Sequence, residues 1–389
     1  MDSVKDLCTR VALSLIVLSH GAVRGDETSN VEHTIVAIEK DRFHGWPANN
    51  GVWTWGDEIL VGLTQGDFTL RKGHNIGGRQ DSLLARSLDG GRSWKMFDPT
   101  GFLDDENRQF LGDGKKALEQ PLDFTHTGFA LRVFASGYHG NNDPEGGFFY
   151  SYDRGQNWTG PHTLNGLSEH PELEGKILSP RTDYLVQGGR RCLVFISAGD
   201  TRGSQKQIGC VQTTDGGLTF EFVAWVTPET TESRGIMSQT VQLSGHEFIL
   251  AFRKIYTDSR DDTIESYRST DGCNTWAHLS TIKVMETQSN PPALLRLNDG
   301  RICCAYGDRH VGEIRARYSH DHGRTWGPEQ IIRDDFQAMQ SDPDSQEGLN
   351  ADIGYVRLAL RSDGKLVAIY YWVTAKHPQQ HIAASIWEP

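Results

Sequence analysis

The chain has 389 residues, 37% hydrophobic and 23% charged, which is ample length for a sizeable buried core. Its formal net charge of −12 argues against nucleic acid or an anionic membrane surface as the main partner, while leaving room for a local basic pocket. Its 42 glycines and 10 tryptophans, with few long apolar runs, predict many short strands and tight turns.

The N-terminal stretch has a different composition from the rest. Lys5 and Arg10 precede the apolar run VALSLIVLSHGAV, which is too short to span a bilayer, and small residues follow up to Gly25. This order is typical of a secretory signal peptide, with a membrane anchor as the alternative. We therefore predict a signal peptide over residues 1–25 and a mature chain that is secreted or periplasmic. No later apolar run is long enough to span a membrane.

A turn of eight residues recurs five times, as SLDGGRSW, SYDRGQNW, TTDGGLTF, STDGCNTW and SHDHGRTW. The Asp carboxylate and the Ser or Thr hydroxyl can hydrogen-bond to the backbone of the turn, and Gly supplies a positive φ. The final Trp or Phe would pack against the neighbouring sheet. The aspartates are therefore predicted to be structural rather than catalytic: Asp89, Asp153, Asp215, Asp271 and Asp321.

Six segments between these turns read as a strand, a short polar turn and a second strand. They are VWTWGDEILVGL, FALRVFASGY, YLVQGGRRCLVFIS, TVQLSGHEFILAF, LLRLNDGRICCAYG and LALRSDGKLVAIYYW. Six four-stranded units predict an all-β fold, a single six-bladed β-propeller over residues 26–389, closed by pairing of VEHTIVAIE with HIAASIW. Because hairpin turns and Asp turns would share one rim, we expect the functional site on the opposite rim.

The pattern S/T-x-D-x-G-x-x-W/F on a six-bladed plan resembles the sialidase (neuraminidase) superfamily, whose repeats are called BNR repeats or Asp boxes. RFHGWPANNG, NPPALLRLNDGR and DIGYVRLALRSDGKLVAIYYW resemble secreted bacterial exo-α-sialidases. The resemblance implies an exo-acting glycoside hydrolase that removes terminal sialic acid with retention of configuration. Three arginines would bind the substrate carboxylate, a Tyr paired with a Glu would attack the anomeric carbon, and an Asp would be the acid and base. A Tyr nucleophile avoids the repulsion that a carboxylate would suffer beside sialic acid.

The resemblance assigns the arginines as follows. Arg253 in AFRK and Arg309 in YGDRH occupy the second and third arginine positions. Arg42 is the candidate for the first, although the sequence reads Arg-Phe-His-Gly-Trp-Pro where the family has Arg-Ile-Pro. Arg181 in SPRTDY and Arg357 in GYVR compete with it for that position.

The resemblance also suggests catalytic groups. Tyr355 in DIGYVR is the expected nucleophile, and Glu232 in TESRGIM is its expected partner, with Glu229 as the alternative. The acid/base falls in the loop TQGDFTLRKGHNIGGRQD, where Asp67 and Asp81 are both candidates.

Other polar residues lie on the predicted functional rim. Asp352 could hydrogen-bond sugar hydroxyls or hold Tyr355, and Trp46 and Trp372 could stack on a sugar or pack between blades. His126, His139 and His310 come from different blades, and a hydrogen-bonding role is favoured over a metal site because no ligand spacing supports one. We expect no metal and no organic cofactor.

Two other functions remain open on sequence grounds. A propeller lyase or hydrolase acting on a uronate-containing glycan would keep the arginines and use His and Tyr as base and acid. A non-catalytic glycan-binding propeller would need only aromatic and polar surface residues. A monomer is expected in each case. Cys192 and Cys210 could face each other in a hairpin, but buried free thiols are the favoured reading.

Overall fold

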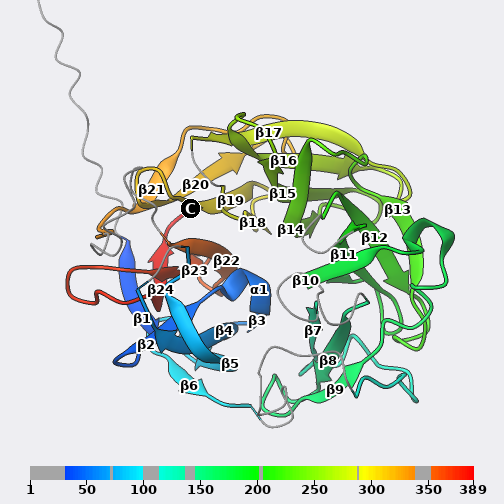
Figure 1. Ribbon diagram of the computed structural model, residues 1–389, viewed down its shortest axis with the longest axis horizontal. Coiled ribbons are helices and arrows are strands. Elements are labelled where there is room, and N and C mark those ends of the chain that lie inside the picture. The colour runs from blue at the N-terminus through cyan, green and yellow to red at the C-terminus, as the bar shows by residue number, and fades with distance from the viewer. Residues whose placement is uncertain are drawn as a thin grey trace, which may run out of the picture.

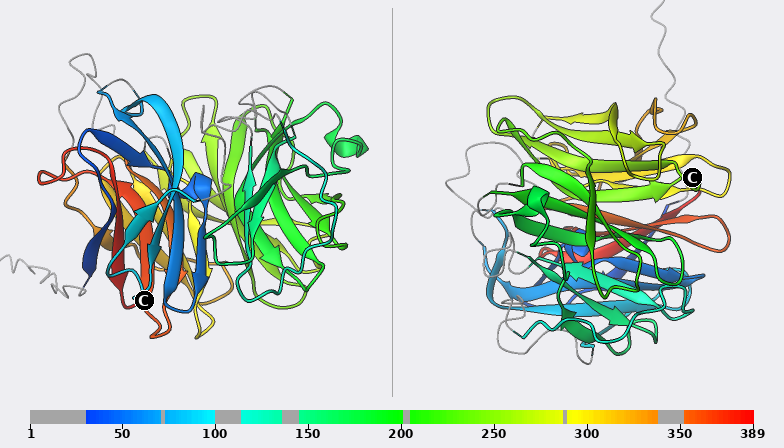
Figure 2. Two further views of the ribbon diagram at one scale, coloured as in Figure 1. Left: turned by 90° about the horizontal axis from the view of Figure 1, so that it is seen from below. Right: turned by 90° about the vertical axis from the view of Figure 1, so that its right-hand side faces the viewer.

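The computed structural model describes residues 31–70, 73–99, 114–135, 145–200, 205–286, 289–337 and 352–389. The expected signal peptide lies outside these residues. Six antiparallel sheets stand around a common centre as the blades of a β-propeller, so the predicted fold class is confirmed (Figure 1). The side views show the blades side by side, with their strands running between the two rims (Figure 2).

The first three blades contain β2 (Arg42–Gly45), β3 (Val52–Trp55), β4 (Glu58–Phe68), β5 (Ile76–Ser87) and β6 (Lys95–Phe97); β7 (Ala130–Phe134), β8 (Gly147–Ser151) and β9 (Thr159–His162); and β10 (Ile177–Val186), β11 (Cys192–Gly199), β12 (Gln207–Thr213) and β13 (Glu221–Trp225). Two short helices are α1 (Pro47–Asn50) and the 3-10 helix η1 (Pro171–Leu173).

The last three blades contain β14 (Ser233–Gln242), β15 (Phe248–Tyr256), β16 (Asp262–Ser269) and β17 (Ala277–Met285); β18 (Ala293–Arg296), β19 (Ile302–Asp308), β20 (Glu313–Ser319) and β21 (Gln330–Arg333); and β22 (Gly354–Leu360), β23 (Leu366–Trp372), β24 (His381–Trp387) and β1 (Glu32–Ala37). A strand covered by neighbours on both faces reads as an unbroken apolar run, as LVAIYYW does in β23, where every residue is buried.

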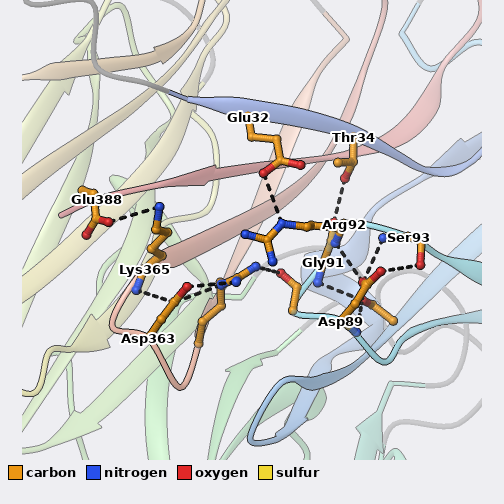
Figure 3. Close-up of polar contacts among 12 residues, drawn as sticks. Glu32, Thr34, Asp89, Gly91, Arg92, Ser93, Asp363, Lys365 and Glu388 are labelled. Atoms are coloured by element: carbon orange, nitrogen blue, oxygen red, sulfur yellow. Dashed lines mark hydrogen bonds and ion pairs between the residues drawn. The ribbon is translucent and has the colours of Figure 1, made fainter.

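Blade 6 contains strands from both ends of the described chain. β1 pairs antiparallel with β24, from Glu32 opposite Ile386 to Ala37 opposite Ile382. The first Asp turn packs onto β1, where Thr34 Oγ1 donates to the carbonyl of Gly91 at 2.9 Å (Figure 3). This pairing closes the ring in the way that the sequence predicts.

The Asp turns satisfy their own backbone. Asp89 Oδ1 accepts from the N–H groups of Arg92 and Ser93 at 3.0 and 2.9 Å, and Asp89 Oδ2 accepts from Ser93 Oγ at 2.6 Å (Figure 3). Burial raises the pKa of Asp89, but the hydrogen bonds from Ser93 and Ser87 outweigh it and lower this pKa to about 2. These carboxylates are thus engaged in the turns.

Hairpin turns and Asp turns meet on one rim, as expected. The N–H of Gly90 donates to Asp57 O at 2.9 Å, and that of Gly272 donates to His246 O at 3.0 Å. The longer connections therefore leave from the opposite rim, where the carboxyl ends of β4, β15, β19 and β23 lie.

Blade 2 departs from the prediction. FALRVFASGY was expected to form a hairpin, but residues 130–134 are the single strand β7, and blade 2 has three strands within the described chain. Side chains bind the inner edge of β7 instead: Trp53 Nε1 donates to Leu131 O at 3.1 Å, and Leu131 N donates to the Tyr184 hydroxyl at 3.4 Å. The two side chains therefore satisfy the backbone carbonyl and N–H of Leu131, which would otherwise pair with a further inner strand.

Residues 119–127 are also placed differently from expectation, because they approach the Asp-turn rim rather than the functional rim. Leu122 N donates to Gly216 O, and Phe124 N donates to Gly189 O, at 2.8 and 2.9 Å. His126 therefore does not join the expected group of rim histidines; its ring lies 4.7 Å from that of Tyr152 in the second Asp turn.

The helix α1 lies at the centre of the ring (Figure 1). Three blades hold it: Arg132 Nη2 donates to Asn50 Oδ1 at 2.7 Å, Thr182 Oγ1 donates to Asn50 O at 3.2 Å, and Arg357 Nη2 donates to Ala48 O at 2.8 Å. The helix thus separates the functional rim from the part of the centre that lies nearer the Asp turns.

The cysteines in the described residues are free and buried. Cys192 is opposite Thr213 and Cys210 is opposite Phe195, so the hairpin disulfide between Cys192 and Cys210 does not form. No helix of the described chain has the length and apolar character needed to cross a bilayer.

Candidate active site

Tyr355, the second residue of β22, has a strained backbone conformation. Its φ is 52°, in the left-handed region, and it follows Gly354 with a φ of 99°. Its N–H donates to Asn290 Oδ1 at 3.1 Å, and the residue is 2% exposed. Left-handed backbone in a non-glycine residue costs about 1–2 kcal/mol and persists where surrounding contacts enforce it, often at functional sites.

Two arginines flank the ring of Tyr355. The guanidinium carbons of Arg253 and Arg309 each lie 5.8 Å from its centroid. Both arginines are at least 95% buried, and each donates to a backbone carbonyl, Arg253 to Ser289 O and Arg309 to Ile353 O. The Nε of Arg253 has no hydrogen-bond partner among the described residues. The structure thus brings together three of the expected site residues, Tyr355, Arg253 and Arg309.

A second group of polar residues adjoins this phenol. The Tyr371 hydroxyl donates to Asp352 Oδ1 at 2.6 Å and accepts from Arg309 Nη2 at 2.8 Å. His74 Nδ1 donates to the same Asp352 oxygen at 2.7 Å. The rings of Tyr355 and Tyr371 are 5.8 Å apart. His74, Asp352 and Tyr371 therefore form one hydrogen-bonded triad beside Tyr355.

The charges in this triad follow from its surroundings. Burial raises the pKa of Asp352, but the hydrogen bond and charge of His74, with the charge of Arg309, hold this pKa below its usual value. Burial raises the pKa of Tyr371 well above its usual value. At neutral pH an ionised Asp352 therefore accepts from a protonated Tyr371.

Sequence reasoning named Asp352 but missed this arrangement. Neither His74 nor Tyr371 was among the residues expected at the site. The hydrogen bond from His74 to Asp352 joins positions 278 residues apart. The available signal was alternation in β23: Tyr371 faces the Tyr355 cluster, while Tyr370 faces the next blade interface.

Arg42, Asp67 and Asp81 form a separate cluster in blade 1. Arg42 binds Asp67 through Nη1, and its Nη2 lies 3.8 Å from Asp81 and donates to Gln65 Oε1 at 3.2 Å. Asp67 is the more open of the two acids, with 57% of its side chain exposed against 20% for Asp81. Arg79 Nε also binds Asp81, at 3.0 Å, so the two carboxylates are matched by two guanidinium groups.

A buried histidine supports this cluster. The Gln65 amide lies 3.0 Å from His44 Nε2. Burial and the positive charge of Arg42 lower the pKa of His44 to about 3, so its ring is neutral over the whole physiological range.

Glu232 is placed away from its expected role. Its carboxylate accepts from Arg260 Nη2 at 2.8 Å, and 69% of the side chain is exposed, whereas Tyr355 is almost fully buried. Glu229 is exposed as well. Among the described residues, the structure therefore shows no contact between Tyr355 and Glu232.

The two competing arginines belong to the surroundings of α1. Arg181 donates to Pro180 O at 3.0 Å. Burial, and to a lesser extent the positive charge of Arg181, lower the pKa of Arg132 to about 9. Arg357 is 3% exposed and binds Ala48 O of α1.

The remaining candidates are accounted for as follows. Trp372 is fully buried and donates to Asp335 Oδ1 at 2.9 Å, which makes it a core residue, while Trp46 lies with its ring 5.0 Å from that of His74. His310 is paired with Glu286 at 3.0 Å, and His139 lies outside the described residues. No group of three or more potential metal ligands occurs in the part of the chain that the structure describes.

Comparison with known families identifies a repeat architecture. The model of the BNR repeat-like domain matches residues 98–369. No curated protein sequence matches the chain.

Several solved structures have a similar fold. A Dyadobacter fermentans protein of unknown function is 20% identical with a TM-score of 0.66, over 92% of this chain and 99% of that one. The α-L-arabinofuranosidase Arb93A from Fusarium graminearum is 13% identical with a TM-score of 0.55, over 89% and 96%. The NanB sialidase from Streptococcus pneumoniae is 11% identical with a TM-score of 0.55, over 91% and 70%. At such identities the likeness concerns the fold.

Proposed function

The chain belongs to the BNR repeat-like domain family, and from this membership and the geometry around Tyr355 we propose a glycoside hydrolase that removes terminal acidic sugars, with sialic acid as the first substrate to test. The observation that carries the proposal is the proximity of two buried guanidinium groups, those of Arg253 and Arg309, to the ring of Tyr355. Planar guanidinium groups bind carboxylates well and remain charged at any working pH. Similar folds in a sialidase and an arabinofuranosidase are consistent with glycan chemistry.

In the proposed reaction, Arg253 and Arg309 hold the substrate carboxylate while the Tyr355 oxygen attacks the anomeric carbon. The two positive charges stabilise the negative charge that develops on this oxygen as its proton leaves. A glycosyl–tyrosine intermediate forms as the bond to the leaving oxygen breaks, and water then releases the sugar with retained configuration.

The proton transfers need two further groups. Asp67, the more exposed acid of the blade 1 cluster, protonates the leaving oxygen and later accepts a proton from water, with Asp81 as the alternative. Because Glu232 is paired with Arg260, we assign the acceptance of the Tyr355 proton to Asp352, through the hydroxyl of Tyr371.

The triad also favours a second candidate, a lyase acting on uronate-containing glycans. In that reaction the arginines neutralise the uronate carboxylate, His74 or Tyr355 removes the proton beside it, and the bond to the leaving oxygen breaks to give an unsaturated product. The hydrogen bond from His74 to Asp352 orients the imidazole as such a base requires.

The test is an assay of the mature chain on a fluorogenic α-sialoside, with Tyr355→Phe and the control Tyr267→Phe, which changes a tyrosine on β16, the third strand of blade 4. We expect release by the wild type and the control, and a loss of about a hundredfold or more in Tyr355→Phe. A wild type that releases no sugar contradicts the sialidase proposal. Ultraviolet absorbance from a uronate polymer would then support the lyase, and glycan binding with neither activity would support a non-catalytic propeller.

A further inference from the structure

A cavity lies at the centre of the ring, on the Asp-turn side of α1. It has a volume of about 290 Å³, and strands from several blades line it with aromatic residues and polar groups, including Trp53, Trp55, Tyr184, Gln239 and Arg357. The volume corresponds to roughly ten water molecules at liquid density, which is enough for a monosaccharide-sized ligand.

This cavity is distinct from the Tyr355 site. Arg357 on the cavity wall donates to Ala48 O of α1, so this helix lies between the cavity and the functional rim. The wall formed by Trp55 reaches the Asp-turn rim, because Arg154 of the second Asp turn lies 5.9 Å from the centroid of the Trp55 ring. A ligand in the cavity would therefore enter from the rim opposite the candidate active site.

Arg357 lies on the wall of this cavity with part of its hydrogen-bonding capacity unused. It is 3% exposed, its Nη2 binds Ala48 O, and its Nε and Nη1 have no acceptor among the described residues. Burial lowers the pKa of Arg357 to about 10, so it stays charged at neutral pH. Buried donors of a charged group that lack acceptors destabilise a protein, and an acceptor supplied by a ligand would remove that penalty.

The neighbouring charges favour an anion. Asp183 is the buried carboxylate whose charge acts on Arg357, but its oxygens accept from Ser238 Oγ and from Thr240 N and Oγ1 at 2.7–3.0 Å. Arg132 and Arg181 add positive charge around the same helix. The oxygens of Asp183 are thus engaged by Ser238 and Thr240 rather than by Arg357, which leaves Arg357 as the cationic group on this wall that an acid can bind.

We propose that this cavity is a second ligand site for a monosaccharide-sized organic acid. The ligand carboxylate accepts hydrogen bonds from Arg357, and the apolar face of its ring packs against Trp53 or Trp55. Gln239, which makes no side-chain hydrogen bond to a described residue, lies on the wall to bind a hydroxyl. The site does not depend on catalysis at Tyr355.

The test is calorimetric titration of the full mature chain with glucuronate, and with glucose as the neutral probe. We expect a glucuronate site that survives Arg253→Gln, is weakened about tenfold or more by Arg357→Gln, and does not bind glucose comparably. Loss of binding in Arg253→Gln alone, with Arg357→Gln unchanged, would place all glucuronate at the Tyr355 site and overturn the proposal.

A second variant protects the test against misfolding. Gln239→Leu changes the cavity wall without removing a buried charge, and we expect it to weaken glucuronate binding in the Arg253→Gln background. Unchanged affinity in that double variant would mean that the cavity holds only water. A sialidase assay that fails while the Arg357-dependent site persists would contradict the proposed function and leave this inference standing.

Discussion

The backbone N–H of Tyr355 donates to the side-chain oxygen of Asn290 at 3.1 Å, and this bond fixes Tyr355 at a φ of 52°. Asn290 is fully buried and fills the space beside two glycines: a Cβ added at Gly354 would lie 2.5 Å from its Oδ1, and one at Gly307 would lie 3.2 Å from its Nδ2. Asn290 is therefore a positioning residue for the proposed nucleophile.

Replacing Asn290 by Ala removes the acceptor that holds Tyr355. We expect kcat to fall about tenfold or more with a small change in KM, because misplacing the attacking group raises the barrier more than it weakens binding. Asn165→Ala is the control, since Asn165 makes its hydrogen bond to Leu218 O at an exposed site. Equal kcat values for the two variants would contradict a positioning role.

Tyr371→Phe deletes the hydroxyl that joins Asp352 to Arg309. We expect a loss of activity of about tenfold or more, since the proposed proton acceptor loses its contact with the Tyr355 side. The adjacent Tyr370 is a matched control, because its hydroxyl binds Ser385 and lies 3.5 Å from Arg333, in the next blade interface. Tyr370→Phe should cost about 1 kcal/mol of unfolding free energy with activity kept. Steady-state kinetics and urea unfolding of both variants test this prediction, and an equal loss of activity in the two variants would contradict it.

Arg309→Lys keeps a positive charge but loses the planar group that the substrate carboxylate requires. We expect KM for an acidic substrate to rise about tenfold, while the methyl ester of that substrate responds little. Arg361→Lys is the control, because Arg361 pairs with Asp363 at 2.9 Å on the Asp-turn rim. A similar rise for acid and ester would show that Arg309 does not bind the carboxylate.

His44 predicts a pH dependence of stability. Its pKa is about 3 in the folded protein and near 6.5 when the chain unfolds, so between these values only the unfolded state takes up the proton. Stability is therefore fully present above pH 6.5 and falls as the pH drops below it, by at most about 1.4 kcal/mol per pH unit from this group. Urea unfolding of His44→Gln between pH 7 and pH 5 should show a shallower slope than the wild type. An unchanged slope would assign the loss to other groups, such as His381.

The sequence predicted best where structure depends on nearby residues. Each Asp turn closes with hydrogen bonds between residues two to four positions apart, as from Ser87 and Ser93 to Asp89, so its pattern is legible in eight letters. Strand alternation then fixes the blades. The hairpin predicted for FALRVFASGY was wrong because Trp53 and Tyr184, from other blades, bind the backbone at the free edge of β7. Nothing in the local sequence of β7 indicates these distant partners.

The site was only partly predictable for the same reason. The family resemblance named Arg253, Arg309 and Tyr355, and the fold places them around one ring. The contact of His74 with Asp352 depends on closure of the ring, which brings a loop of blade 1 against the start of blade 6.

Ring closure also sets the order in which this protein matures. Glu32 pairs with Ile386, so β1 leaves the ribosome long before its partner strand β24 has been made. At typical rates of synthesis the delay is roughly 20 to 70 seconds, during which β1 has no partner strand. Tyr355 and Tyr371 both belong to blade 6. Nascent chains that stop before residue 381 would therefore hold Tyr355 and Tyr371 in an incomplete blade 6 without β24, however well their first five blades have folded.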